Sequence, residues 1–245
     1  MSVELAGKRA IITGGGSGIG KGIARHFVDA GAEVVITGRS PDRLNSTVAE
    51  LGPSATPVVA DVSSESDVQD LFRATVDEGQ HVDILVNSAG AFAGDVVDDL
   101  DLTDWQRVID VNLTGMFLCC REAFRHMRPN GGGRIINIGS ISGSRPRAHS
   151  AAYSASKHAV WGLTQALALD GRQDGVVVSC LNPGNTMVER RADGHAVAGR
   201  DEGVEPMMDV DSVARLAFLM AALPPEVNLL EATILPTTQE YVGRG

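Results

Sequence analysis

Tyr153 and Lys157 are the residues of this sequence whose types and spacing most directly suggest catalysis. They stand four positions apart in Tyr153-Ser154-Ala155-Ser156-Lys157, so a helix would place both side chains on one face. A free phenol titrates near pH ~10, which makes it a poor base at neutrality, but a neighbouring lysine charge favours the phenolate. The pair therefore suggests acid–base chemistry, although the same spacing is equally typical of an ordinary helix surface.

Ser140 and Asn112 are the polar residues that would complete such a site. Ser140 ends the apolar run that precedes Tyr153, and ligands of α/β sheets bind outside the carboxyl ends of strands. Its hydroxyl is therefore expected at the edge of the site, where it can bond a substrate oxygen. Asn112 interrupts an apolar helical stretch and needs a polar partner, so it belongs either to the site or to a satisfied pair in the core.

A glycine-rich loop near the N-terminus points to a bound dinucleotide. Thr13-Gly14-Gly15-Gly16-Ser17-Gly18-Ile19-Gly20 follows an apolar run and opens an amphipathic segment. Glycines let the backbone amides approach a pyrophosphate, and the helix N-terminus adds a favourable dipole. A tight turn without a ligand is the alternative, but a strand–turn–helix placement favours the dinucleotide.

The end of the second apolar run indicates which dinucleotide is bound. An NAD site usually carries Asp or Glu there, to accept hydrogen bonds from the ribose 2′-hydroxyl. This sequence has Gly38, Arg39 and Ser40 instead. An arginine can pair with a 2′-phosphate, so NADP is favoured over NAD, unless Arg39 is only a surface residue of the loop.

The elements that must position these residues alternate along the chain. Short, nearly continuous apolar runs are typical of strands buried on both faces, and longer amphipathic segments lie between them. The predicted strands are Arg9–Thr13, Glu33–Thr37, Thr56–Ala60, Asp83–Val86, Arg134–Ile138, Val176–Leu181 and Thr233–Leu235. The predicted helices span 18–30, 41–51, 65–78, 103–128, 151–170 and 210–222. We therefore expect a single α/β domain over 1–245: a doubly wound, mostly parallel seven-stranded sheet with helices on both faces, as in a Rossmann fold.

Composition narrows the classes of function. The net charge of −10 disfavours nucleic acid as a partner, and no apolar run is long enough to span a membrane. Three unevenly spaced cysteines argue against a disulfide framework, and the absence of a signal peptide and of metal-ligand spacing leads us to expect a cytoplasmic protein without a metal. The polar stretch at about 185–209 is expected to be a mobile substrate loop, or else an insertion without a role.

Together these residues resemble the short-chain dehydrogenase/reductase family, in its common short form, over essentially the whole chain. The matching motifs are the loop Thr13–Gly20, the adenine-contacting pair Asp61-Val62, the tetrad Asn112, Ser140, Tyr153 and Lys157, and Asn182-Pro183-Gly184. The resemblance implies that Tyr153 is the general acid in reduction and the base in oxidation, and that Ser140 stabilises the carbonyl oxygen. It also implies that Lys157 binds the nicotinamide ribose and favours ionisation of the tyrosine, while Asn112 holds a water of a proton relay.

The residues expected to hold the cofactor follow from the loop and from this resemblance. They are Gly14, Ser17, Gly18, Ile19, Gly20, Gly38, Arg39, Ser40, Asp61, Val62, Asn87, Ala89, Gly90, Tyr153, Lys157, Pro183, Gly184 and Thr186.

The sequence departs from the family pattern in three places. The family's Asn-Asn-Ala-Gly reads Asn87-Ser88-Ala89-Gly90, where a small polar serine should preserve the contact between strands. The threonine often found five residues past the proline is Val188 here, and Thr186 is the candidate to replace it. The frequent C-terminal Asp-Gly-Gly, which often helps to close the site and to pack tetramers, is absent.

We therefore expect an NADP-dependent oxidoreductase that transfers a hydride between the cofactor and a carbonyl or secondary alcohol. Candidate substrate contacts are Ser142, Gly143, Arg145, Arg147 and His149, with Glu189, Arg190 and Arg191 in the loop. The resemblance also implies a homodimer or homotetramer built on the helices at 103–128 and 151–170. Two alternatives remain: an NADP(H)-binding sensor without turnover, and a dehydratase or epimerase with bound NAD. Fold alone cannot separate them, but a pure sensor has no chemical need for Ser140, Tyr153 and Lys157 together.

Overall fold

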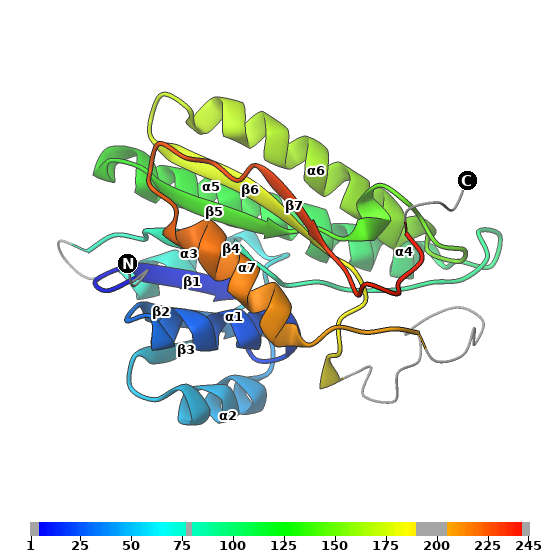
Figure 1. Cartoon of the computed structure of the whole chain (residues 1–245), viewed down its shortest axis with the longest axis horizontal. Helices are drawn as coiled ribbons and strands as arrows, with labels where there is room; N and C mark the ends of the chain where they lie inside the picture. Colours follow the sequence, from blue (N-terminus) through cyan, green and yellow to red (C-terminus); the bar gives the residue numbers. More distant parts are fainter. Residues whose placement is uncertain (1–4, 77–79, 190–204, 242–245) are drawn as a thin grey trace.

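Parallel strands form one twisted sheet in the order β3-β2-β1-β4-β5-β6-β7 (Figure 1). The computed structural model describes residues 5–76, 80–189 and 205–241. Within them the strands are β1 Arg9–Thr13, β2 Glu33–Gly38, β3 Ala55–Val59, β4 Ile84–Asn87, β5 Gly133–Ile138, β6 Val176–Pro183 and β7 Glu231–Ile234. Each neighbouring pair is parallel, so all the carboxyl ends lie along one edge of the sheet.

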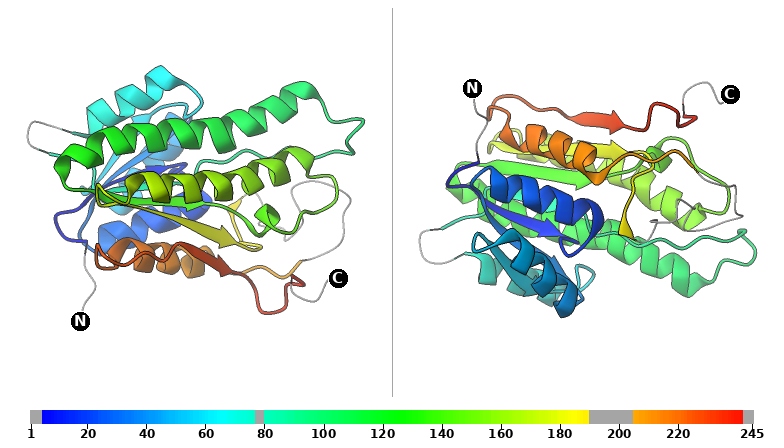
Figure 2. Two further views of the ribbon diagram at one scale, coloured as in Figure 1. Left: turned by 90° about the horizontal axis from the view of Figure 1, so that it is seen from above. Right: turned by 60° about the horizontal axis from the view of Figure 1, so that its bottom comes forward.

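Helices cover both faces of the sheet, as the two views of Figure 2 show. They are α1 Gly18–Asp29, α2 Pro41–Leu51, α3 Glu65–Thr75, α4 Leu102–Ile109, α5 Gly115–Met127, α6 Ala151–Gly171 and α7 Val210–Ala222. A π-helical turn, η1 Asp110–Thr114, joins α4 to α5, and short 3-10 turns lie at η2 Arg128–Asn130 and η3 Ile141–Gly143. The doubly wound parallel sheet with helices on both faces confirms the predicted fold class.

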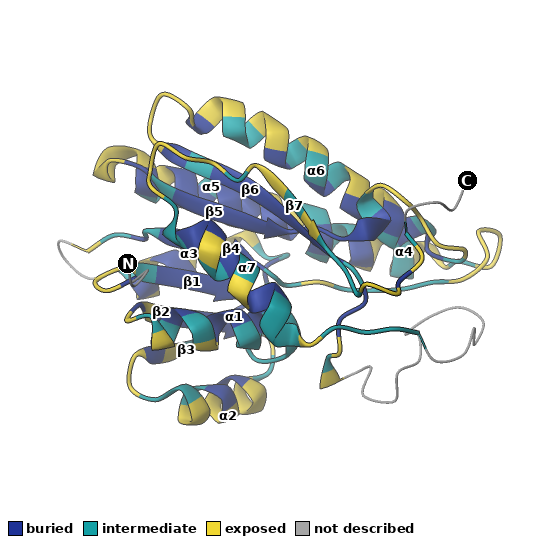
Figure 3. Ribbon diagram, in the orientation of Figure 1, coloured by how far each residue is buried: buried dark blue, intermediate teal, exposed yellow. Residues whose placement is uncertain are grey.

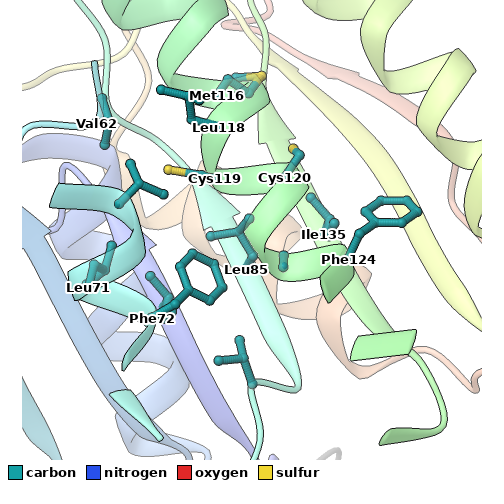
Figure 4. Packing of buried hydrophobic residues seen from close by; sticks show 14 of the residues in the cluster. Val62, Leu71, Phe72, Leu85, Met116, Leu118, Cys119, Cys120, Phe124 and Ile135 are labelled. Atoms are coloured by element: carbon teal, nitrogen blue, oxygen red, sulfur yellow. The ribbon is translucent and has the colours of Figure 1, made fainter. Parts of the chain in front are cut away.

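Two hydrophobic cores fill the space between the sheet and its helices. One contains Phe27 of α1 and Met220 of α7, and the other contains Phe72 of α3 and Met127 of α5. Cys119 and Cys120 lie in the second core beside Leu85 and Ile135, as Figure 4 shows. The central strands are therefore covered on both sides, which Figure 3 displays as a continuous buried sheet.

The order of the strands changes direction between β1 and β4, and the two loops that follow these strands meet there. Thr13 at the end of β1 pairs in register with Asn87 at the end of β4. The Thr13 hydroxyl oxygen accepts hydrogen bonds from the backbone amides of Ser88 and Ala89, each at 3.0 Å. The donors are main-chain amides, so this contact does not depend on the side chain at position 88, and it fixes the glycine loop at the switch point where such sheets bind ligands.

The structure corrects several predicted boundaries. The helix predicted over 103–128 is helical from Leu102 to Met127 but contains the π turn, because one additional residue is accommodated in the ladder. The helix predicted over 65–78 ends at Thr75, since Val76 is extended and packs against the core.

The two edge strands also differ from their predicted ranges. β3 begins and ends one residue earlier than predicted, and β7 begins two residues earlier and ends one residue earlier. Both pair on one side only, and β7 alternates between exposed and half-buried residues, so the pattern of a strand buried on both faces does not describe it.

The described ranges show neither a membrane span nor a metal site. No helix there has the length and apolar character that crossing a membrane requires. The same ranges contain no group of three His, Cys, Asp or Glu side chains placed to hold a metal ion.

Candidate active site

A cavity of about 660 Å³ opens at the carboxyl edge of the sheet and joins the glycine loop to the predicted catalytic residues. Its described lining comes from the loops after β1, β4, β5 and β6, from the start of α1, and from α2 and α6. The lining residues are Gly14, Gly16, Ser17, Gly18, Ile19, Arg43, Ser88, Ala89, Gly90, Ala91, Phe92, Ile138, Gly139, Ser140, Ile141, Ser142, Arg147, Ala148, Ser150, Tyr153, Lys157, Pro183, Gly184, Asn185, Thr186, Val188 and Glu189.

The glycine loop is shaped so that only glycine fits at two of its positions. Gly14 has a φ of +66°, and a Cβ added there would lie 2.9 Å from the Cα of Ala89. A Cβ at Gly20 would lie 2.5 Å from the Gly14 carbonyl oxygen. The loop therefore folds tightly over the start of α1, and Gly14, Ser17, Gly18 and Ile19 all line the cavity. This cradle fits the pyrophosphate of a dinucleotide, because the glycines of the loop carry no side chains of their own to fill it.

Tyr153 and Lys157 lie near the start of α6 and both line the cavity. Lys157 is only 5% exposed, and its Nζ donates a 2.8 Å hydrogen bond to the carbonyl oxygen of Ile138 at the end of β5. The same nitrogen lies 5.7 Å from the centroid of the Tyr153 ring. The ring of Phe92 packs against the ring of Tyr153, and their centroids are 5.1 Å apart. A fixed positive charge thus lies beside a phenol whose ring is held in place.

Ser140 stands at the end of β5, and its position is fixed by hydrogen bonds on two sides. Its Oγ accepts from the amide of Ser142 at 3.1 Å, so the serine caps the short turn η3. Its own amide donates to Oδ1 of Asn182 on β6 at 3.2 Å. Asn182 in turn donates from Nδ2 to Glu231 of β7 at 2.9 Å. The hydroxyl is therefore presented to the cavity by three adjacent strands.

Asn112 does not belong to the described cavity lining. It is buried within the π turn, where its Oδ1 accepts from the amide of Ala91 at 2.7 Å. Its Nδ2 donates to the Ala91 carbonyl and to Ser156 Oγ, each at 3.0 Å. These bonds connect the loop after β4 to helix α6. The Asn112 side chain therefore helps to hold in position the part of α6 that carries Tyr153 and Lys157, without itself belonging to the described lining of the cavity.

Most of the residues expected to hold the cofactor lie on the cavity, but seven of them do not belong to its described lining. Ala89, Gly90, Pro183, Gly184 and Thr186 line it, as do the loop residues and the catalytic pair. The seven are Gly20, Gly38, Arg39, Ser40, Asp61, Val62 and Asn87.

Five of these seven have other surroundings in the fold. Asp61 accepts hydrogen bonds from Ser63, and Asn87 is buried against Asn137 of β5. Val62 packs beneath Gly115 at the start of α5. Arg39 is exposed just past β2, and Ser40 caps α2 by accepting from the amide of Arg43 at 3.4 Å.

Arg43 is a cavity residue that the sequence reasoning missed. It lies in the first turn of α2, with its Cβ close to Gly16. A cation is disfavoured near a helix N-terminus by the helix dipole, so an arginine there suggests a negatively charged ligand. That signal was present in the sequence three residues after Ser40.

Some of the candidate substrate contacts line the cavity and others do not belong to its described lining. Ser142, Arg147 and Glu189 line the cavity, whereas Gly143 packs on the Lys157 backbone and Arg145 lies over the ring of Tyr241. His149 is not among the described lining residues and has a φ of +56°. Arg190, Arg191 and the rest of 190–204 lie outside the described residues.

A polar cluster that the sequence did not reveal closes the outer wall of the cavity. Arg147 donates to Glu205 at 2.6 Å and to Asn185 at 2.8 Å. The amide of Asn185 donates to Oε1 of Gln239 at 2.9 Å, and Gln239 is buried. The C-terminal segment therefore supports this wall through the lining residue Asn185, without an Asp-Gly-Gly motif.

Comparison with known proteins identifies the family. The family model for short chain dehydrogenase matches residues 8–196. The chain belongs to the short chain dehydrogenase family. An uncharacterized oxidoreductase of Staphylococcus epidermidis is 33% identical over 229 residues, which cover 94% of this chain and 97% of that protein.

Two solved structures extend the likeness to the fold. A 3-ketoacyl-(acyl-carrier-protein) reductase from Brucella melitensis, complexed with NADH, has a TM-score of 0.83 and 30% identity, covering 94% of this chain and 98% of the other. A serine dehydrogenase complexed with NADP⁺ has a TM-score of 0.86 and 28% identity, covering 97% and 98%. This short chain dehydrogenase is thus an oxidoreductase, and a sensor without turnover is not favoured.

Proposed function

We propose that this short chain dehydrogenase transfers a hydride between NADP(H) and a carbonyl or secondary alcohol, with Ser140, Tyr153 and Lys157 as catalytic residues. The observation that carries the proposal is their position: all three line the same described cavity as residues of the glycine loop. Cofactor and substrate would therefore meet at the carboxyl end of β5. The bound nicotinamide supplies the hydride in reduction and accepts it in oxidation.

Each catalytic side chain has a role that its surroundings support. The Tyr153 hydroxyl donates a proton to the substrate oxygen in reduction and takes it back in oxidation. The buried ammonium of Lys157 stabilises negative charge on the phenol, and one of its three N–H donors already holds the Ile138 carbonyl. The other two can bond the ribose hydroxyls of the cofactor. Ser140 donates its hydroxyl proton to the substrate oxygen, where charge develops in the transition state.

Asn112 acts as a positioning residue. Its hydrogen bonds to Ala91 and Ser156 hold the loop after β4 against α6. By resemblance to the family, Asn112 also holds a water that links Lys157 to a proton relay. The π turn that carries it is consistent with a functional role, because π turns inside α-helices often occur at functional sites.

Selectivity for NADP is supported by cations at the end of β2. Gly38 stands where an NAD site would carry an acid, and Arg39 follows it. Arg43 in the first turn of α2 adds a second arginine to the cavity lining, with its Cβ close to Gly16. The known neighbours include both an NADH and an NADP⁺ complex, so the proposal rests on these residues of the chain itself.

The enzyme is proposed to act as a homodimer or homotetramer. The helices that the family resemblance implicates expose large apolar side chains, among them Phe117 of α5 and Leu169 of α6. Light scattering of the purified protein measures the assembly directly.

An absorbance screen tests the function. Purified protein is mixed with NADPH or NADH and a panel of carbonyls, and with NADP⁺ or NAD⁺ and a panel of alcohols. We expect turnover of at least one substrate, with NADPH preferred. Because a charge-assisted hydrogen bond contributes about 1.5–3 kcal/mol, Arg39→Ala or Arg43→Ala should raise the KM for NADPH about tenfold or more and leave that for NADH unchanged. Equal use of both cofactors, unaffected by either substitution, would contradict the selectivity.

A further inference from the structure

Glu189 places its carboxylate on the first amide of helix α1. The backbone N–H of Gly18 donates to Oε2 of Glu189 at 2.9 Å and to Oε1 at 3.2 Å. The first amides of a helix have no partner within the helix, and the side chain of Ser17 makes no capping hydrogen bond with a described residue. The carboxylate therefore satisfies an amide that the chain would otherwise leave to an outside anion.

The segment that carries Glu189 is held in place from two sides. The amide of Met187 donates to the carbonyl of Met208, and the amide of Met208 donates to the carbonyl of Asn185, each at 2.9 Å. Val188 packs against Gly18, where its Cγ1 lies 3.1 Å from the position of an added Cβ. The chain just past β6 is thus anchored to the segment before α7 and delivers Glu189 to the glycine loop.

This carboxylate is the exception in a cavity whose other described charged lining residues are basic. Arg43, Arg147 and Lys157 are cationic, and Glu189 is the one acidic residue among the described residues that line the cavity. A cavity that binds a polyanionic cofactor gains nothing in affinity from an acid at its phosphate loop. Moreover, the Gly18 amide cannot serve a carboxylate and a pyrophosphate together, because two anions at one donor repel each other.

We propose that Glu189 is an internal competitor for the pyrophosphate subsite, which occupies the Gly18 amide in the free enzyme and lowers the affinity for the dinucleotide. The inference rests on the proposed cofactor site but not on the choice between NADP and NAD, since both carry the pyrophosphate. In the catalytic cycle the carboxylate takes the amide as the oxidised or reduced cofactor leaves, and so favours cofactor exchange.

Titration calorimetry tests the competition without measuring activity. The dissociation constant for NADP⁺ is determined with the wild type, Glu189→Gln, Glu189→Ala and the remote control Glu226→Gln. Because an anion near a helix N-terminus typically contributes 0.3–1 kcal/mol, the two Glu189 variants should bind NADP⁺ about two- to fivefold more tightly. The control variant should match the wild type. A thermal melt of each variant checks that it is folded.

The ligand 2′-AMP separates competition at the pyrophosphate from a general charge effect. It carries the adenosine and the 2′-phosphate without a pyrophosphate, so its affinity should be the same in all four proteins. Unchanged or weaker NADP⁺ binding by folded Glu189→Gln and Glu189→Ala would overturn the inference, and so would an equal gain for 2′-AMP. With NAD⁺ as ligand, the same gain is expected even if the proposed preference for NADP fails. Binding of neither dinucleotide to any variant would contradict the proposed function itself.

Discussion

The amide of Ser140 donates a hydrogen bond to Oδ1 of Asn182, which ties the predicted catalytic serine to the neighbouring strand. Gly139 makes this contact possible, because an added Cβ there would collide with the same oxygen atom. Glu231 orients the amide of Asn182 by accepting from its Nδ2. The position of the serine hydroxyl thus depends on a chain of contacts that crosses β5, β6 and β7.

Asn182→Ala should lower both stability and turnover. It leaves the buried Ser140 amide without its acceptor, which costs about 1–3 kcal/mol in the free energy of unfolding. The hydroxyl of Ser140 also loses its fixed position, so the fold-decrease in kcat should be larger than the fold-increase in the KM for the cofactor. Urea denaturation and steady-state kinetics measure the two effects. Glu231→Gln is the matched control, because its amide oxygen can still accept from Asn182 and both quantities should stay near wild type. Wild-type stability and kcat in Asn182→Ala would refute this role.

The three cysteines should be inert in the folded protein. Burial raises the pKa of Cys120 to about 12 and that of Cys180 to about 11, and burial likewise raises the pKa of Cys119. At pH 8 a thiol with a pKa of about 11 is ionised to roughly one part in a thousand, against about a quarter for a free cysteine. A thiol-reactive dye should therefore label the native enzyme slowly and the urea-unfolded enzyme rapidly at all three positions. The native rate should rise with pH up to the raised values. Rapid labelling of the native protein at pH 8 would show that these thiols are accessible.

A pair of glycine substitutions should change stability in opposite directions. A Cβ at Gly115 would lie 2.8 Å from Val62 Cγ2 and 2.9 Å from its carbonyl oxygen, so Gly115→Ala should destabilise the fold by about 1–3 kcal/mol through overpacking. Gly162 lies in α6 with nothing within 4 Å of its added Cβ, so Gly162→Ala should stabilise by about 0.5–1 kcal/mol. Chemical denaturation of both variants tests the prediction, which fails if the two changes have the same sign.

The sequence predicted the sheet and its central strands closely, for a physical reason. Strands such as β5 and β6 are covered on both faces, so their apolar runs mark their length within a residue or two. The edge strand β7 lacks this signal, and its predicted range was displaced. The π turn at Asp110–Thr114 leaves no clear mark in hydrophobic periodicity, because it is shorter than the stretch of about 11–18 residues over which a period is recognised.

The sequence predicted those parts of the candidate site whose residues lie close together in one element. It did not predict the parts that are formed by contacts between distant segments. Tyr153 and Lys157 share a helix face, and the glycine loop is contiguous, so the sequence alone indicated both. The contacts of Gln239 with Asn185, and of Glu189 with Gly18, join segments that are 54 and 171 positions apart. No local pattern could show them.

Replacement of Tyr153 by phenylalanine tests the central claim most directly. The substitution removes only the hydroxyl, and the ring can keep its contact with Phe92. Using the carbonyl that the wild type reduces fastest, NADPH oxidation is followed in both proteins, and NADPH binding is measured separately by fluorescence. The account predicts unchanged NADPH binding and a fall in kcat of about 100- to 10,000-fold, the usual contribution of a general acid. Turnover by Tyr153→Phe at the wild-type rate would contradict it.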